Sequence, residues 1–182
     1  MSNCVIKNSV CSKEAGGIYF SNNNLKSGYV YLPKDIRMIN VTLINNTVLS
    51  VGSSNNNGGG GVQVKECTNA YLLNVTFINN TARIGGGLYF YNRGNSDPIK
   101  IIKNIIFINN TATEGGGAIY VQYKSTITDN VFIGNKALNS ASGGAIYINA
   151  NPVTISKNNF TILFASLQKM TKWGGLVLAW VM

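Results

Sequence analysis

Two short motifs alternate along this chain, and their recurrence limits its fold more than any other feature. One motif is an aromatic residue with asparagine three positions later, and the other is a glycine pair that leads into an apolar stretch. The clearest copies are Phe77–Asn80 with Gly85–Phe90, Phe107–Asn110 with Gly116–Val121, and Phe132–Asn135 with Gly143–Ile148. Fixed motifs at a regular period are typical of a solenoid, in which each repeat forms one coil.

Weaker copies flank these three and extend the repeat over most of the 182 residues. The anchor residues of the first motif lie 25 to 38 residues apart: Val5, Leu43, Phe77, Phe107, Phe132 and Phe160. The uneven steps predict insertions in loops, at 26–37 and 50–57. Each copy carries about three short β-rich runs, which is the number that one turn of a three-sided coil needs. The sequence therefore predicts an all-β fold, a parallel β-helix of about six coils with three short strands per coil.

The strand after each glycine pair has an alternating pattern. Its flanking residues are apolar, and strand side chains alternate between faces, so we expect these pairs to point inward. The residue between them should point outward in successive coils: Tyr19, Gln63, Tyr89, Tyr120, Tyr147 and Val177. The four tyrosines are our candidate binding residues, and Tyr89, Tyr120 and Tyr147 should stack about 5 Å apart on one face, where they could contact sugars or a partner protein. The alternative is that tyrosine simply favours strands and pairs well with its neighbours.

Asparagine recurs three positions after the anchor residue. We predict that these side chains bond amide to amide along the axis, as a structural ladder of Asn8, Asn46, Asn80, Asn110 and Asn135. Small residues five positions after the anchor suit an inward corner: Val10, Val48, Ala82, Ala112, Ala137 and Ala165. Most Asn-x-Thr sequences fall inside the repeat and are explained by the same ladder and turn chemistry. The last copy has Leu163 in place of the ladder asparagine, so we expect residues 160–182 to form a degenerate or frayed coil.

Charge and composition exclude several functions. The net charge of +9 comes from fifteen Lys and Arg against six Asp and Glu, and the cations, Lys100 among them, are scattered rather than clustered. We therefore expect no nucleic-acid partner, and read the basic charge as a means of solubility. Three cysteines without metal-ligand spacing and no histidine predict no metal site and no cofactor, while a Cys4–Cys11 disulfide is left open. No apolar stretch is long enough to span a bilayer.

The paired motifs resemble the repeats of the polymorphic outer membrane proteins of chlamydiae and of adhesin-like surface proteins of other microbes. Phe77–Asn80, Phe107–Asn110 and Phe132–Asn135 match the first family motif, while Gly116–Ile119 and Gly143–Ile146 match the second. The resemblance covers about residues 70 to 150. It implies a right-handed parallel β-helix, the passenger part of an exported autotransporter-like protein, located at the cell surface or secreted, with a role in adhesion.

The remaining functional alternatives stay open at this stage. We expect a non-enzymatic module that binds glycans or proteins of a host or neighbouring cell, or else a structural stalk without binding activity. A polysaccharide-degrading enzyme of the pectate-lyase type needs grouped carboxylates, and the six acidic residues show no such pair. We treat residues 1–182 as one β-helix domain and expect a fragment of a longer protein, because the chain begins and ends inside a coil and shows no export signal. Exposed coil ends would also favour end-to-end self-association.

Overall fold

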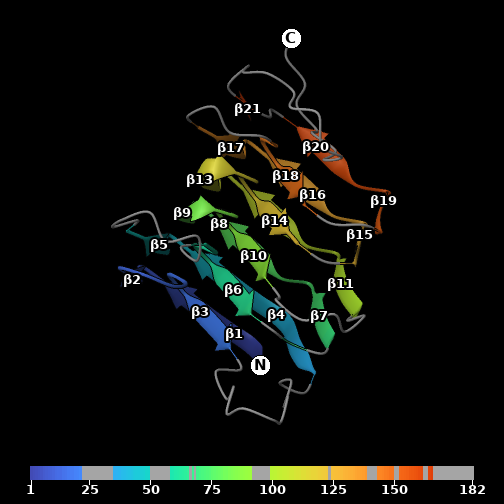
Figure 1. The fold of residues 1–182 in the computed structure, drawn as a ribbon. Coiled ribbons are helices and arrows are strands. Elements are labelled where there is room, and N and C mark those ends of the chain that lie inside the picture. The colour runs from blue at the N-terminus through green and yellow to red at the C-terminus, as the bar shows by residue number, and fades with distance from the viewer. Residues whose placement is uncertain are drawn as a thin grey trace, which may run out of the picture.

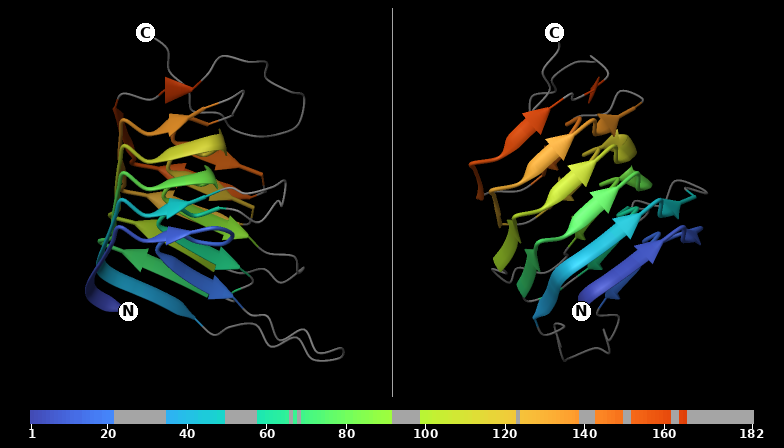
Figure 2. Two further views of the ribbon diagram at one scale, coloured as in Figure 1. Left: turned by 90° about the vertical axis from the view of Figure 1, so that its left-hand side faces the viewer. Right: turned by 180° about the vertical axis from the view of Figure 1, so that it is seen from behind.

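The computed structural model describes residues 1–21, 35–49, 58–65, 67, 69–91, 99–122, 124–138, 143–149, 152–161 and 164–165. These residues form three parallel sheets that wind around a common axis as a stack of coils (Figure 1). Seen from the side, successive coils lie one above the other from the N-terminal to the C-terminal end (Figure 2). The prediction of a parallel β-helix is confirmed. Most of the predicted insertion at 26–37, all of that at 50–57 and all but a few residues of the predicted degenerate coil lie outside the described residues. The end of the first insertion was predicted wrongly, because Ile36 and Arg37 belong to the strand Ile36–Ile44.

The first sheet, sheet A, contains ten strands, and most coils contribute two consecutive strands to it. In chain order these are β1 (Ser2–Lys7), β4 (Ile36–Ile44), β7 (Asn69–Leu73), β8 (Thr76–Ile78), β11 (Ile99–Lys103), β12 (Ile106–Ile108), β15 (Ser125–Thr128), β16 (Val131–Ile133), β19 (Val153–Ser156) and β20 (Asn159–Thr161). The nine-residue strand β4 is unbroken and pairs with both β7 and β8, so the two halves of sheet A meet at this strand.

The second and third sheets receive one strand from each coil that reaches them. Sheet B consists of β2 (Val10–Cys11), β5 (Thr47–Val48), β9 (Thr81–Ile84), β13 (Thr111–Gly115), β17 (Lys136–Ala137) and β21 (Phe164–Ala165). Sheet C consists of β3 (Ile18–Ser21), β6 (Val62–Lys65), β10 (Leu88–Tyr91), β14 (Ile119–Val121) and β18 (Ile146–Ile148). The glycine pairs turn the chain from sheet B into sheet C.

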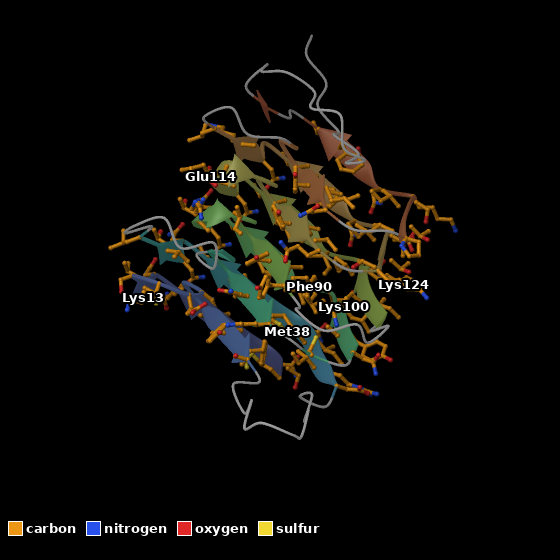
Figure 3. All side chains as sticks on the ribbon, in the orientation of Figure 1. Lys13, Met38, Phe90, Lys100, Glu114 and Lys124 are labelled. Atoms are coloured by element: carbon orange, nitrogen blue, oxygen red, sulfur yellow. The ribbon has the colours of Figure 1, made fainter. Side chains whose placement is uncertain are left out.

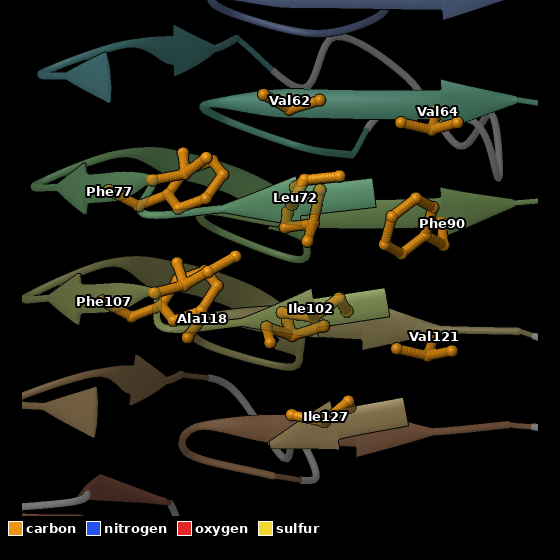
Figure 4. Close-up of a cluster of buried hydrophobic side chains, with 14 of the residues drawn as sticks. Val62, Val64, Leu72, Phe77, Phe90, Ile102, Phe107, Ala118, Val121 and Ile127 are labelled. Atoms are coloured by element: carbon orange, nitrogen blue, oxygen red, sulfur yellow. The ribbon is translucent and has the colours of Figure 1, made fainter. Parts of the chain in front are cut away.

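The apolar core lies between sheets A and C. The predicted inward pairs of sheet C are buried in the three clearest copies, and they face the inward residues of sheet A (Figure 4). The anchor phenylalanines form a continuous stack along the axis: the centroids of Phe77 and Phe107 are 4.8 Å apart, and those of Phe107 and Phe132 are 5.0 Å apart. The rings are almost parallel, because the parallel register repeats the same side-chain position in each coil.

The glycine corners are needed because backbone passes close to backbone there. A β-carbon on Gly117 would lie 2.1 Å from the carbonyl oxygen of Gly144 and 2.5 Å from that of Lys136. The preceding residue of the same corner, Gly116, has a φ of +61°, in the left-handed region that suits glycine. The corner therefore requires glycine at both positions.

The register of the first coil differs by one residue from the predicted one. The register pairs Ile6, not Val5, with Leu43, and the Val5 side chain is 63% exposed. The coil is thus aligned one residue later than the motif suggested. The same shift replaces Val10 by Cys11 at the small-residue position opposite Val48. Cys4, Cys11 and Cys67 are all free, so the disulfide that was left open is not formed.

Candidate functional site

The predicted tyrosine column lies on the outer side of sheet C. The register places Tyr19 opposite Gln63, Gln63 opposite Tyr89, and the remaining tyrosines in line with them. The rings of Tyr120 and Tyr147 are stacked, with centroids 4.7 Å apart and planes 27° from parallel. Tyr89 and Tyr120 meet edge to face at 5.3 Å. Tyr19, Tyr120 and Tyr147 are half-buried and keep part of each ring accessible.

Tyr89 does not lie on the surface as predicted, because only 1% of it is exposed. Its ring fills the space beside Gly58, where a β-carbon would lie 2.3 Å from the Tyr89 Cδ1 atom, and Ile84 lies against the same position. Gln63, in the same column, is fully buried as well. The sequence pattern identified which side of the strand these residues occupy, but it could not indicate that sheet B would cover that side.

A groove of about 380 Å³ lies beside Tyr89, between sheets B and C. From sheet B it is lined by Arg83, Ile84 and Glu114, and Figure 3 shows Glu114 on β13. From sheet C and the residues just after its strands it is lined by Tyr89, Tyr91, Tyr120, Gln122 and Asn149. The groove thus combines three tyrosines with two amides and one ion pair, contributed by three successive coils.

The ion pair joins the two coils on the sheet B side. The Arg83 Nε atom donates to the Glu114 carboxylate, and the arginine side chain is 18% exposed against 47% for the glutamate. The register shifts between Ala112 and Gly115, so β13 carries a bulge at this point. A bulge redirects a side chain. Here Gly115 instead of Glu114 pairs with Ile84, and the Glu114 side chain lies beside Arg83. No pattern in the sequence predicted this irregularity.

The hydroxyls of Tyr89 and Tyr120 in the groove are neutral donors at physiological pH. Burial raises the pKa of Tyr89, with the neighbouring Tyr120 as a smaller cause. Burial also raises the pKa of Tyr120, opposed by hydrogen bonds from the side chains of Gln122 and Asn149. The buried Tyr89 hydroxyl has no hydrogen-bond partner among the described residues. A buried hydroxyl without a partner is unfavourable, and the residue that carries it lines the groove.

The asparagine ladder runs inside the corner between sheets A and B. The Nδ2 atom of Asn46 donates to the Oδ1 atom of Asn80 over 2.9 Å, and Asn80 donates to Asn110 and Asn110 to Asn135 in the same way, each over 3.0 Å. Each of these amides also donates to a backbone carbonyl of a neighbouring coil: Ile6, Leu43, Phe77 and Phe107. These four asparagines are completely buried. Their role is structural.

Asn8 does not belong to this ladder, and its assignment was wrong. Because the first coil is aligned one residue later, Ser9 takes the ladder position, where its backbone N–H donates to the Asn46 Oδ1 atom. Asn8 instead has a φ of +57° and stands at the outer corner, where it accepts a hydrogen bond from Asn45.

Two outer columns of left-handed residues were not predicted. One contains Asn3, Asn40, Asn74, Asn104, Asp129 and Lys157, and the other contains Asn8, Asn45, Asn79, Asn109 and Gly134. Asparagine tolerates the left-handed conformation better than most residues, so turn chemistry explains why so many Asn-x-Thr sequences occur in the repeat. A second inner ladder, from Asn130 to Asn158, was also missed. Its sequence signal was an asparagine at a position where earlier coils have Val75 and Ile105.

Lys100 was counted among the scattered surface cations, but it is 2% exposed. In sheet A it is in register with Ala70 and Ser125, which are also buried, and its Nζ atom donates to the Cys67 carbonyl oxygen over 3.0 Å. Burial raises the pKa of the Cys67 thiol, although the positive charge of Lys100 opposes the rise. This pair is a polar contact within the core, away from the groove.

The described residues contain neither a candidate metal site nor a candidate membrane-spanning helix. Among them, no group of three or more His, Cys, Asp or Glu residues could hold a metal ion. The same part of the chain contains no helix with the length and apolar character needed to cross a membrane.

The repeat motifs match a known protein family. Residues 74–91, 104–122 and 131–149 match the family described as the Chlamydia polymorphic membrane protein (Chlamydia_PMP) repeat. The three matches include the stacked residues Phe77, Phe107 and Phe132, three of the four asparagines of the inner ladder and every described lining residue of the groove. No curated protein and no solved structure matches the chain. Three coils of this parallel β-helix therefore match the Chlamydia polymorphic membrane protein repeat, over just under a third of the 182 residues.

Proposed function

We propose that this chain is a non-enzymatic binding module displayed at a cell surface, and that the outer side of sheet C is its contact face. The observation that carries the proposal is the stacked pair Tyr120 and Tyr147, which lies half-buried at the side of a groove. Half-exposed aromatic rings on rigid strands are frequent anchors of recognition surfaces. The family's description as a membrane protein supports display at the surface.

The groove chemistry favours binding over catalysis. One carboxylate, Glu114, is among the described lining residues, and it is engaged by Arg83. Glycoside hydrolysis ordinarily uses two carboxylates that flank the bond to be broken. A tyrosine with a raised pKa is also a weak general base at neutral pH, and burial raises the pKa of both Tyr89 and Tyr120.

A cell-binding assay tests this proposal. Beads coated with the purified chain are incubated with cultured animal cells and with bacterial cells, and bound beads are counted. We expect the double variant Tyr120→Ser, Tyr147→Ser to bind at least about tenfold less than the unchanged chain. The matched control is Tyr71→Ser on β7, because Tyr71 is half-buried on the outer side of sheet A and contacts Arg37.

Each result separates the two candidate functions. Equal binding by the double variant and the unchanged chain would remove the tyrosine face as the contact surface. If the unchanged chain binds no cell type, the stalk without binding activity becomes the better description. Circular dichroism of each variant establishes that the β-helix is still folded.

A further inference from the structure

We infer that the groove between sheets B and C is a binding site for a sugar residue of a neutral glycan. This inference rests on the proposed function, because it names the ligand class of the same face. It concerns the concave corner of that face, whose most buried lining residues are Tyr89 and Ile84 and which shares Tyr120 with the stacked tyrosine pair.

The volume and the lining residues of the groove suit a ligand the size of one sugar ring. Its volume of about 380 Å³ lies near the lower end of the range of roughly 300–1,000 Å³ that is usual for small-molecule sites. Tyr91 and Tyr120 flank the ring of Tyr89, at centroid distances of 5.9 and 5.3 Å. A sugar ring has an apolar C–H face that can pack on such aromatic surfaces, and hydroxyl groups around its edge.

The polar groups of the groove match those hydroxyl groups. Gln122 and Asn149 offer amide donors and acceptors, while Glu114 offers a carboxylate that is about half exposed. The buried Tyr89 hydroxyl is the most specific indication, because it lines the groove and has no partner among the described residues. A ligand hydroxyl that pairs with it would remove the cost of leaving a buried hydroxyl unpaired.

Charge favours a neutral ligand over an anionic one. The described lining contains one cation, Arg83, and its charge is matched by Glu114 in direct contact. The net charge of +9 is carried elsewhere on the chain. An acidic polysaccharide would therefore gain little in the groove itself, and any attraction to it would be diffuse and sensitive to salt.

The test uses the whole chain and a panel of immobilised oligosaccharides, neutral ones built from hexoses and N-acetylhexosamines and heparin as the anionic comparison. The informative variant is Tyr89→Phe, which keeps the ring and removes only the hydroxyl. The matched control is Tyr71→Phe, which makes the same change on the outer side of sheet A. Isothermal titration with the best neutral oligosaccharide gives the dissociation constant of each protein.

We expect at least one neutral oligosaccharide to bind, with an affinity that Tyr89→Phe lowers about tenfold, equivalent to about 1.4 kcal/mol, and Tyr71→Phe leaves unchanged. Binding to heparin alone, binding to no oligosaccharide, or equal affinity for Tyr89→Phe and the unchanged chain would each overturn the inference.

The cell-binding assay separates this inference from the proposed function. If Tyr89→Phe beads still bind cells fully and free oligosaccharide does not compete, the contact face stands and the sugar site is wrong. If the unchanged chain binds neither cells nor oligosaccharides, both are wrong.

Discussion

Asparagine has opposite roles at adjacent positions of the repeat. Asn110 is completely buried, and its amide bridges Asn80 and Asn135 and also binds the Phe77 carbonyl. Asn109, one residue earlier, is exposed and has a φ of +52°. The first position needs the amide group, whereas the second needs a residue that tolerates the left-handed conformation.

Substitution at these two positions should therefore have different effects. We expect Asn110→Ala to lower the free energy of unfolding by about 3 kcal/mol, because buried donors and acceptors lose their partners. Asn109→Gly should change it by less than about 1 kcal/mol, because Gly134 already occupies the equivalent place in the next coil with a φ of +61°. Urea unfolding followed by circular dichroism measures both, and equal costs would contradict the separate roles.

Tyr89 provides a prediction about alkaline pH. Its pKa is raised in the folded chain by burial, so the folded chain keeps the proton to a higher pH than the unfolded chain does. The unfolded pKa is about 10, and stability must fall as the pH rises through and above that value. We expect Tyr89→Phe to gain stability relative to the unchanged chain between about pH 9 and about pH 11. A difference that stays constant over this range, measured by urea unfolding, would contradict the burial of the hydroxyl.

At the level of elements, successive positions of a glycine corner differ in the space that they leave for a β-carbon. Gly117 has no space for a β-carbon, because three backbone atoms lie within 2.6 Å of it. The next position of the corner is Gly87 in one coil but Ala118 and Ala145 in the following two. The first site is therefore fixed by a close backbone contact. At the second, a β-carbon on Gly87 would lie 2.9 Å from the Ala118 carbonyl oxygen, a smaller conflict at a position where the next two coils have alanine.

Two alanine substitutions test this difference. Gly117→Ala should destabilise the chain by about 3 kcal/mol, because the sheet B and sheet C strands of adjacent coils must separate. Gly87→Ala should cost at most about 1 kcal/mol, since alanine occupies the same place in neighbouring coils. The midpoint of thermal unfolding compares the two variants. An equally large loss for Gly87→Ala would mean that the corners are not equivalent between coils.

The elements also explain how far the sequence could predict this molecule. Strand alternation and repeated motifs were enough to predict the parallel coils, the inward residues of sheet C and the side of the strand on which Tyr120 and Tyr147 lie. They could not predict the burial of Tyr89, which depends on Gly58 in a neighbouring coil, or the Arg83–Glu114 pair, which depends on a bulge. Contacts that recur in every coil, such as the phenylalanine stack and the asparagine ladder, leave a periodic pattern in the sequence, whereas a contact made in one coil only leaves none.

At the scale of the whole molecule, each coil contacts mainly the coils before and after it, so stability should be distributed along the axis. Phe107 stacks on both Phe77 and Phe132, whereas the described contacts of Phe160 include a stack on one side, with Phe132 at 4.7 Å. We expect Phe107→Ala to cost about 4 kcal/mol and Phe160→Ala about half as much. Urea unfolding distinguishes them, and a larger cost for Phe160→Ala would contradict a core that is continuous along the axis.

The same geometry gives the molecule two long faces with different chemistry, the outer side of sheet A with Tyr71 and the outer side of sheet C with Tyr120 and Tyr147. Hydroxyl-radical footprinting compares these faces directly, because the accessible part of each tyrosine ring is oxidised and the product is read by mass spectrometry. The measurement is made on the free chain and on the chain bound to cells. We expect binding to protect Tyr120 and Tyr147 and to leave Tyr71 unchanged. Protection of Tyr71 with unchanged oxidation of Tyr120 and Tyr147 would contradict the assignment of sheet C as the contact face.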